Sequence, residues 1–223
     1  MKLNVGILGG GSWGTTVASL TAKKNDTILW ARNEKVVREI NEEHTNSEYL
    51  PSGKLNKNLK ASSSIEETVN NADVIVMGIP SQHFREVLRV AKPFIRPWVP
   101  IVSLAKGLEL DTKMRMTEII AEELPGHPAG VLTGPNLAKE IHSGLAAAAV
   151  IAMVDKTIAK QLQQVFNTGL FRVYTNNDVI GCELGGALKN IMAIATGMGD
   201  GANAGDNTRA ALITRGLSEL TRL

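Results

Sequence analysis

Hydrophobic and polar positions alternate along the chain in blocks that predict short buried strands separated by helices. Leu3–Leu8 and Thr27–Trp30 are short, mostly apolar stretches, and Asp73–Pro80 is a nearly continuous apolar run that ends in proline. Such unbroken runs are typical of strands that are buried on both faces of a parallel sheet. The same pattern predicts strands at Leu59–Ser62, Ile101–Leu104, Val131–Thr133 and Gly144–Val154.

The segments between these strands carry helical patterns and helix start signals. Ser63 and Ser64 each stand three residues before a glutamate, so two overlapping capping boxes predict a helix start. Ser81 is expected to cap the next helix. Further helices are expected at Thr15–Lys24, Glu34–His44 and Thr112–Leu124, and a polar loop at Thr45–Asn58. This alternation predicts a doubly wound α/β domain with a mostly parallel sheet and helices on both faces.

The pattern changes near Asn177-Asp178, which is expected to cap a long helix over Val179–Met198. Gly199–Asn207 is rich in glycine, asparagine and aspartate and is expected to be a loop. Thr208–Leu223 is then helical again. We therefore expect strands to be absent from this last part of the chain.

These patterns divide the chain into a first domain at residues 1–177 and the beginning of an all-helical domain at residues 178–223. The last four residues, Leu220–Leu223, contain neither a capping glycine nor a proline. Because helices usually end on such a signal, we expect the chain to end before its second domain does.

Composition and charge favour a small-molecule partner. The 24 Lys and Arg side chains nearly balance the 22 Asp and Glu, and the net charge of +2 predicts binding to neither nucleic acid nor an anionic membrane. The single cysteine, Cys182, forms no internal disulfide, and no Cys/His cluster predicts a metal site. The apolar run at Gly144–Val154 is shorter than the ~20 residues that a membrane-spanning helix needs. We expect a cytoplasmic protein without a membrane span.

A glycine motif follows the first strand and opens the first helix. In Gly9-x-Gly11-x-x-Gly14, the first glycine permits a tight turn, the second lets the backbone approach a pyrophosphate, and the third lets helix and strand pack closely. Backbone N–H groups at the helix start then bind the anion. The motif predicts a Rossmann-type dinucleotide-binding domain, with an ordinary glycine turn as the alternative.

The end of the second strand bears on the choice of cofactor. A site selective for NAD carries an acidic residue about 20 residues after the motif, where it binds the ribose 2′-hydroxyl. Here the strand runs into Ala31-Arg32-Asn33 instead. Because arginine suits a 2′-phosphate, we expect NADPH to be preferred to NADH. Two alternatives are a solvated Arg32 and a Glu34 that turns inward to the ribose.

Two further loops are expected to meet at one edge of the sheet. Lys106 lies just past the carboxyl end of a predicted strand, where ligands of open α/β sheets bind. Gly134-Pro135-Asn136 ends the next strand at the same edge. The two loops are therefore expected to face one cleft, although most lysines are simply solvated.

The long helix carries Lys189 and Asn190 beside an expected core stripe. Gly185 and Gly186 stand four and three residues before Lys189 on the same face. Because glycine costs a helix about 1 kcal/mol relative to alanine, the pair needs a reason: space for a ligand beneath the lysine, or close helix packing. The stripe consists of Leu184, Leu188, Ile191, Ala195 and Met198.

Taken together, five segments carry a resemblance to a known family. They are Gly9–Gly14, Ser103–Gly107, Thr133–Glu140, Glu183–Asn190 and Thr208–Gly216. With these segments in this order, the chain resembles bacterial NAD(P)-dependent glycerol-3-phosphate dehydrogenases over essentially its whole length.

The resemblance implies the reversible reduction of dihydroxyacetone phosphate to sn-glycerol 3-phosphate by NADPH or NADH, which supplies phospholipid synthesis. Lys189 resembles the proton donor and acceptor, and burial or a second cation such as Lys106 is expected to lower its pKa. Asn136 departs from the family, in which serine is common. The expected cofactor-binding residues are Gly9, Gly11, Ser12, Trp13, Gly14, Arg32, Lys106 and Ala138. The expected substrate-binding residues are Lys106, Gly134, Asn136, Lys189 and Asn190.

The resemblance also implies a longer chain. The family's Gly-Leu-Gly-Asp-Leu motif and its arginine-containing phosphate loop are absent from this sequence. We therefore expect an incomplete substrate site, weak catalysis and apolar helix faces that a second copy covers in a homodimer. The alternatives are a non-catalytic dinucleotide-binding fragment, a related reductase of the 6-phosphogluconate or ketopantoate type, and a structural interaction protein.

Overall fold

The computed structural model describes residues 2–222, and within them eight strands form one sheet. The strands are β1 (Asn4–Leu8), β2 (Asp26–Trp30), β3 (Lys60–Ser62), β4 (Val74–Met77), β5 (Ile101–Ser103), β6 (Ala129–Thr133), β7 (Ala147–Met153) and β8 (Phe171–Asn176). Their order is β3-β2-β1-β4-β5-β6-β7-β8. Neighbouring strands are parallel except for the pair β6 and β7, which is antiparallel. The predicted strands and the mostly parallel sheet are confirmed.

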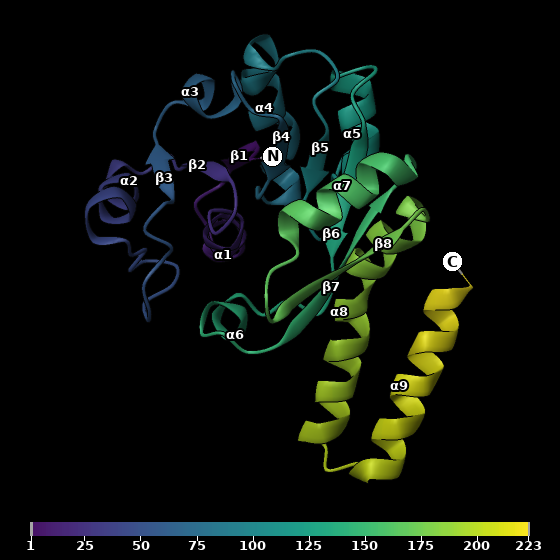
Figure 1. Ribbon diagram of the computed structural model, residues 1–223. Coiled ribbons are helices and arrows are strands. Elements are labelled where there is room, and N and C mark those ends of the chain that lie inside the picture. Colours follow the sequence, from purple (N-terminus) through teal and green to yellow (C-terminus); the bar gives the residue numbers. More distant parts are fainter. Residues whose placement is uncertain (1, 223) are drawn as a thin grey trace.

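Helices cover both faces of the sheet (Figure 1). On one face, α1 (Ser12–Thr21) and α7 (Lys156–Phe166) pack on the strands, and on the other face α3 (Ile65–Val69), α4 (Ser81–Ala91) and α5 (Met116–Glu123) do so. The shorter elements are α2 (Glu34–Arg38), the π-helical turn η1 (Glu39–Glu43), the 3-10 turn η2 (Lys92–Phe94) and α6 (Ala138–His142). The predicted doubly wound architecture is confirmed.

The order of the strands also fixes where a ligand is able to enter. The chain moves from β1 outward to β2 and β3, and then returns to place β4 on the other side of β1. In such a sheet the connections diverge at this point, and a crevice opens at the carboxyl ends of the two strands. Gly9 follows β1 directly and Gly78 follows β4, so the glycine turn lies at this crevice.

Of three predicted helix starts, the structure corrects two and confirms one. Ser81 is the first residue of α4 and its side chain caps nothing among the described residues, because Pro80 occupies the cap position. The helix predicted from Thr112 begins only at Met116. Ser64 does cap α3, with its hydroxyl accepting from the N–H of Glu67 at 3.2 Å.

The last two helices form a hairpin that projects from the sheet, α8 (Val179–Gly201) and α9 (Gly205–Thr221) (Figure 1). The predicted cap of α8 is confirmed, since Asp178 Oδ1 accepts from the N–H of Gly181 at 2.8 Å. The loop predicted at Gly199–Asn207 is wrong. Only residues 202–204 leave the helical conformation, and Arg209 joins the two helices by donating to Asp200 Oδ1 at 2.7 Å.

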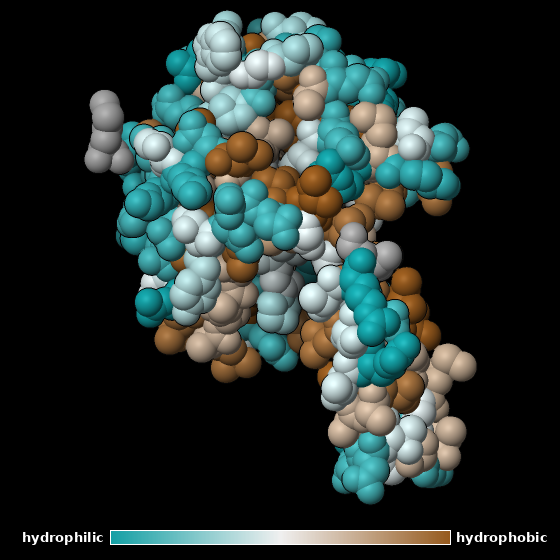
Figure 2. Space-filling model, turned by 90° about the vertical axis from the view of Figure 1, so that its right-hand side faces the viewer, coloured by the Kyte–Doolittle hydropathy of each residue, from teal (hydrophilic) through white to brown (hydrophobic). Residues whose placement is uncertain are grey.

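Figure 2 shows apolar residues on the surface of this projecting hairpin. The predicted core stripe of α8 is therefore wrong for Ile191 and Met198, which are 55% and 70% exposed. The expected exposure of apolar helix faces is confirmed, with Ile180, Ile194, Ile213 and Leu217 also exposed.

One helix among the described residues, α8, is long and apolar enough to cross a membrane by length and composition. The apolar run at Gly144–Val154, from which no membrane span was expected, lies outside this helix. The finding is weak evidence on its own, since core helices of soluble proteins pass the same test.

Candidate functional site

The glycine turn has a backbone that larger residues do not tolerate at two of its positions. Gly9 has a φ of +123°, and a Cβ atom there would lie 2.3 Å from the carbonyl oxygen of Gly78. A Cβ at Gly14 would lie 2.1 Å from the carbonyl oxygen of Gly9. At Gly11, by contrast, no atom of the described residues lies within 4 Å of a Cβ position. The turn therefore packs tightly on its inner side and is open on its outer side.

Helix α1 presents a free amino end to this open side. Its cap residue is Gly11, no described side chain caps it, and its first turn contains no acidic residue. The N–H groups of Ser12, Trp13 and Gly14 have no acceptor inside the helix, because the first turn of any helix lacks one. Such an end attracts an anion through these N–H groups and the helix dipole.

Trp13 adds a donor beside this helix end. Its ring contacts Phe171 edge to face, with ring centroids 6.1 Å apart, so the indole is held in place. Its buried Nε1 atom has no hydrogen-bond partner within residues 2–222. Buried donors are nearly always paired in proteins, so this one suits an acceptor on a ligand.

The Lys106 and Gly134 loops meet, as the sequence predicts. Lys106 Nζ donates to the carbonyl oxygen of Gly134 at 3.2 Å. Burial lowers the pKa of Lys106, and the positive charge of Lys189 lowers it further. Lys106, in the loop after β5, and Lys189 of α8 are therefore close enough to influence each other electrostatically.

The loop that carries Lys106 is fastened by an ion pair that sequence analysis missed. Arg85 on α4 binds Glu109 in bidentate geometry, with Nε–Oε1 at 2.8 Å and Nη2–Oε2 at 2.9 Å. The Arg85 guanidinium holds the pKa of Glu109 at about 2. Gln82 binds the same loop, donating to the carbonyl oxygen of Leu108 and accepting from the N–H of Leu110. No local motif signals these contacts, which join positions far apart in the sequence.

Asn136 lies beside the Gly134 carbonyl with an unpaired side chain. Both its Oδ1 and its Nδ2 are buried and lack partners in the described part of the chain. An unpaired buried amide costs free energy, so this side chain suits a ligand that both donates and accepts. Asn136 therefore still provides a polar side chain at the position where serine is common in the family.

The two glycines of α8 have different surroundings. A Cβ at Gly186 would lie 2.9 Å from Thr133 Oγ1, so close packing on β6 explains this glycine. At Gly185 no described atom lies within 4 Å of a Cβ position, apart from the chain neighbours and the backbone of its own helix. The alternative of close packing is thus correct for one glycine, and open space lies beside the other.

Lys189 and Asn190 are exposed, although their helix was expected to be buried. Lys189 Nζ donates to Asn190 Oδ1 at 2.8 Å. Of the residues of α8 that the structure describes, only Val179 and Glu183 are buried. The structure brings Lys189 toward Lys106 without enclosing it.

Glu183 attaches α8 to the sheet domain and is a second group that sequence analysis missed. Its buried carboxylate accepts from Arg115 Nη1 at 2.8 Å and from the N–H of Thr117 at 3.0 Å. Thr117 is on α5, so these bonds fix the amino-terminal turns of α8. The sequence signal that could have indicated this role is a single acidic residue among the mostly apolar positions at the start of α8.

Two expected cofactor residues complete this edge. Ala138 begins α6, and its carbonyl oxygen lies 3.5 Å from Thr16 Oγ1 of α1. Arg32 is exposed just past β2. A hydrogen bond to Glu48 raises the pKa of Tyr49 while the charge of Arg32 acts in the opposite direction, so Arg32 lies near both.

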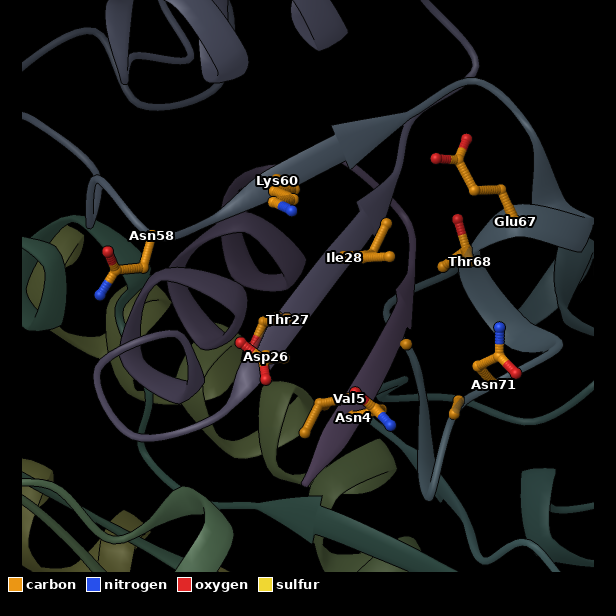
Figure 3. Close-up of a pocket in the computed structure, with 12 residues that line it drawn as sticks. Asn4, Val5, Asp26, Thr27, Ile28, Asn58, Lys60, Glu67, Thr68 and Asn71 are labelled. Carbon is orange, nitrogen blue, oxygen red and sulfur yellow. The ribbon is translucent and has the colours of Figure 1, made fainter. Parts of the chain in front are cut away.

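A separate hollow of about 320 Å³, drawn in Figure 3, lies at the other end of the strands. Its lining includes Asn4, Asp26 and Lys60, the first residues of β1, β2 and β3. None of the expected site residues lines it. The candidate site is therefore the carboxyl edge, where the described residues also contain no cluster of metal-ligating side chains.

Comparison with known proteins gives matches over nearly the whole chain. Residues 4–159 match the family model for the N-terminus of NAD-dependent glycerol-3-phosphate dehydrogenase, and residues 178–223 match the model for its C-terminus. The NAD(P)+ glycerol-3-phosphate dehydrogenase 2 of Sphingopyxis alaskensis is 59% identical over 100% of this chain and 67% of its own length. The corresponding protein of Mycobacterium avium is 53% identical over 97% of this chain and 64% of its own.

A solved structure shows the same architecture. The crystal structure of glycerol-3-phosphate dehydrogenase from Coxiella burnetii superposes with a TM-score of 0.90 at 39% identity, covering 99% of this chain and 68% of that one. The chain spans about two thirds of the length of the curated relatives that it matches. Both family models, the high identities and the shared fold establish that this chain belongs to the NAD-dependent glycerol-3-phosphate dehydrogenase family.

Proposed function

We propose that this chain takes part in the reversible, NAD(P)H-dependent reduction of dihydroxyacetone phosphate to sn-glycerol 3-phosphate, a reaction that supplies phospholipid synthesis. The names of its relatives support this activity. The observation that carries it is that buried side-chain atoms of Trp13 and Asn136 have no hydrogen-bond partner among residues 2–222, on the same edge as the paired Lys106 and Gly134. Such groups suit ligands that supply the missing hydrogen bonds.

The glycine turn fits a nicotinamide dinucleotide. Gly9, Gly11 and Gly14 give the backbone its shape, and the amino end of α1 at Ser12 and Trp13 offers N–H groups to a pyrophosphate. The nicotinamide, when bound, supplies the hydride. Ala138 closes the edge beside α1.

We propose a preference for NADPH over NADH. Arg32 is exposed where a ribose 2′-phosphate is expected, and it stands in place of the acid of NAD-selective sites. An Arg32→Ala variant is expected to lose affinity for NADPH much more than for NADH. Equal losses would show that Arg32 does not bind the 2′-phosphate.

Lys189 serves in this proposal as the proton donor. As hydride adds to the carbonyl carbon of the substrate, Lys189 gives a proton to the carbonyl oxygen, and in the reverse reaction it takes the proton back. Lys106, Asn136 and Asn190 bind polar groups of the substrate, and the Gly134 carbonyl holds Lys106 in place. Burial and, to a lesser extent, the charge of Lys189 lower the pKa of Lys106.

We propose that residues 1–177 form the dinucleotide-binding domain and residues 178–223 belong to a helical substrate domain. The match of residues 178–223 to the C-terminal family model supports this division. We further propose that a second copy covers the apolar faces of α8 and α9, and that the protein works in the cytoplasm, where the lone Cys182 stays reduced.

Oxidation of NADPH in the presence of dihydroxyacetone phosphate tests the activity directly. The 223-residue chain is expected to oxidise NADPH slowly, and Lys189→Met is expected to lower this rate by roughly 10²–10⁴ without changing cofactor affinity. The matched control is Lys160→Met, which replaces an exposed lysine on α7 and is expected to leave the rate unchanged. NADPH binding without turnover would favour a non-catalytic dinucleotide-binding module. Absence of NADPH binding would contradict both this interpretation and the proposed dehydrogenase.

A further inference from the structure

Asn46 is a fully buried polar residue that lies outside the glycine motif but contacts it. Its side chain is 0% exposed, although sequence analysis placed it in a polar loop. It follows the π-helical turn η1, and its backbone pairs with Leu50 in an isolated bridge. Buried asparagines hold specific hydrogen bonds, so the partners of this side chain indicate what it does.

The amide of Asn46 binds the middle of the glycine turn. Its Nδ2 donates to the carbonyl oxygen of Gly10 at 2.9 Å and to Thr15 Oγ1 at 2.9 Å. The Thr15 hydroxyl in turn donates to the same Gly10 oxygen at 3.1 Å. Two donors thus hold one carbonyl group of the turn, and Thr15 is as fully buried as Asn46.

This arrangement determines the direction of the next N–H group. A trans peptide is planar, so fixing the Gly10 carbonyl toward Asn46 points the N–H of Gly11 the opposite way. That direction is away from the buried interior, and the surroundings of Gly11 are open. Three successive glycines have wide conformational freedom, so without these donors the peptide is free to turn its oxygen outward. An outward oxygen would repel an anion that the N–H attracts.

The segment that presents Asn46 is itself held rigidly. The backbone carbonyl oxygen of Asn46 accepts from the N–H of the buried Leu50 at 2.8 Å. Ser47 donates from its N–H at 2.8 Å and from its hydroxyl at 2.9 Å to the carboxylate of Glu39 in η1. These bonds lower the pKa of Glu39, so the carboxylate stays charged and the contact persists. Rigid support of this kind preorganises a binding group.

We propose that Asn46 is a positioning residue that orients the Gly10–Gly11 peptide for the pyrophosphate of the cofactor. The proposal rests on the dinucleotide binding proposed above and adds a residue to it. Asn46 does not touch the ligand. It acts through the Gly10 carbonyl and shares this task with Thr15.

The test compares ligands with and without a pyrophosphate. In Asn46→Ala, the Kd of NADPH and of ADP-ribose is expected to rise about tenfold, as expected for loss of one hydrogen bond that orients an anion site. The Kd of adenosine 2′-phosphate, which lacks the pyrophosphate, is expected to change little. Thr15→Val keeps the branched side-chain shape but removes the hydroxyl that also donates to the Gly10 carbonyl. It is therefore expected to raise the Kd of ADP-ribose in the same way.

Asn41→Ala is the matched control. Asn41 also makes two backbone hydrogen bonds, to the N–H and carbonyl of Ala61 on β3, but it does not contact the glycine turn. The Kd values of Asn41→Ala for NADPH and ADP-ribose are expected to equal those of the wild type, even if its melting temperature changes. A rise in Kd like that of Asn46→Ala would mean that any loosening of this segment weakens binding, and it would overturn the proposal.

The remaining outcomes are also decisive. Wild-type affinity of Asn46→Ala for ADP-ribose overturns the proposal, as does an equal loss for ADP-ribose and adenosine 2′-phosphate. If Asn46→Ala does not fold, Thr15→Val decides by the same criterion. If the wild-type chain binds neither NADPH nor ADP-ribose, the proposed dinucleotide binding itself fails, which is a different result.

Discussion

The sheet domain and the helical hairpin both carry many apolar residues but differ sharply in the burial of these residues. All four residues of β4 and four of the five residues of β1 are buried, and helices cover them on both faces. In α8 only Val179 and Glu183 are buried among the described residues, and in α9 only Gly216. The expected cofactor residues lie in the densely packed domain, and Lys189 and Asn190 lie on the hairpin.

This difference shows which part of the site is rigid within this chain. Dense packing leaves the glycine turn and the Lys106 loop with fixed partners, such as Gly78, Gly134 and Arg85. The hairpin is held mainly at its start, where Glu183 of α8 accepts hydrogen bonds from Arg115 and from the N–H of Thr117 on α5. We therefore expect the sheet domain to respond strongly to small changes and the outer hairpin to tolerate them.

Glycine substitutions give the largest contrast between the two regions. Gly14→Ala places a Cβ 2.1 Å from a backbone oxygen, so it is expected to abolish NADPH binding and to destabilise the fold by several kcal/mol. Gly185→Ala meets open space on a helix and is expected to stabilise by about 1 kcal/mol. Denaturant unfolding measures both. A destabilised Gly185→Ala would contradict the openness of the hairpin.

The attachment of the hairpin is the next most sensitive feature. Glu183→Ala leaves the buried Thr117 N–H and part of Arg115 without an acceptor, so we expect a loss of about 2 to 3 kcal/mol in unfolding free energy. Glu219→Ala, near the carboxyl end of α9, is expected to change stability by less than about 0.5 kcal/mol, because it removes only exposed ion pairs. Similar losses for the two variants would contradict this account.

How far the sequence predicts the molecule depends on the range of the contacts involved. Strands β1 to β7 and the meeting of Lys106 with Gly134 were predictable, because apolar runs mark buried strands and the carboxyl ends of neighbouring parallel strands share one edge. Strand β8 was not predicted. The bond between Glu109 and Arg85 was missed, because the two residues are distant in sequence. Asn46 was missed for the same reason, since nothing near it in the sequence indicates Gly10.

The burial of α8 was predicted wrongly for a different physical reason. Apolar periodicity identifies the face of a helix that is suited to burial, but it does not supply the neighbour that buries it. The stripe at Ile191 and Met198 has no covering element among the described residues. Periodicity therefore predicted the helix correctly and its surroundings incorrectly.

The Arg85–Glu109 pair predicts a smaller, pH-dependent effect within the sheet domain. The pKa of Glu109 falls from 4.5 to about 2 in the folded chain, so the pair stabilises the fold above pH 4.5 and loses this contribution as the pH falls toward 2. Glu109→Gln is expected to cost about 1 kcal/mol at pH 7 and to lack this acid-dependent loss. A stability difference between variant and wild type that stays constant from pH 5 to about pH 2 would contradict this assignment.

Hydrogen exchange of backbone amides with and without NADPH tests most directly whether the sheet domain alone carries an ordered cofactor site. We expect NADPH to slow exchange in Gly11–Gly14, where the amino end of α1 is open, and to leave α9 unchanged. Protection confined to the hairpin, or no protection at the glycine turn at saturating NADPH, would contradict the account.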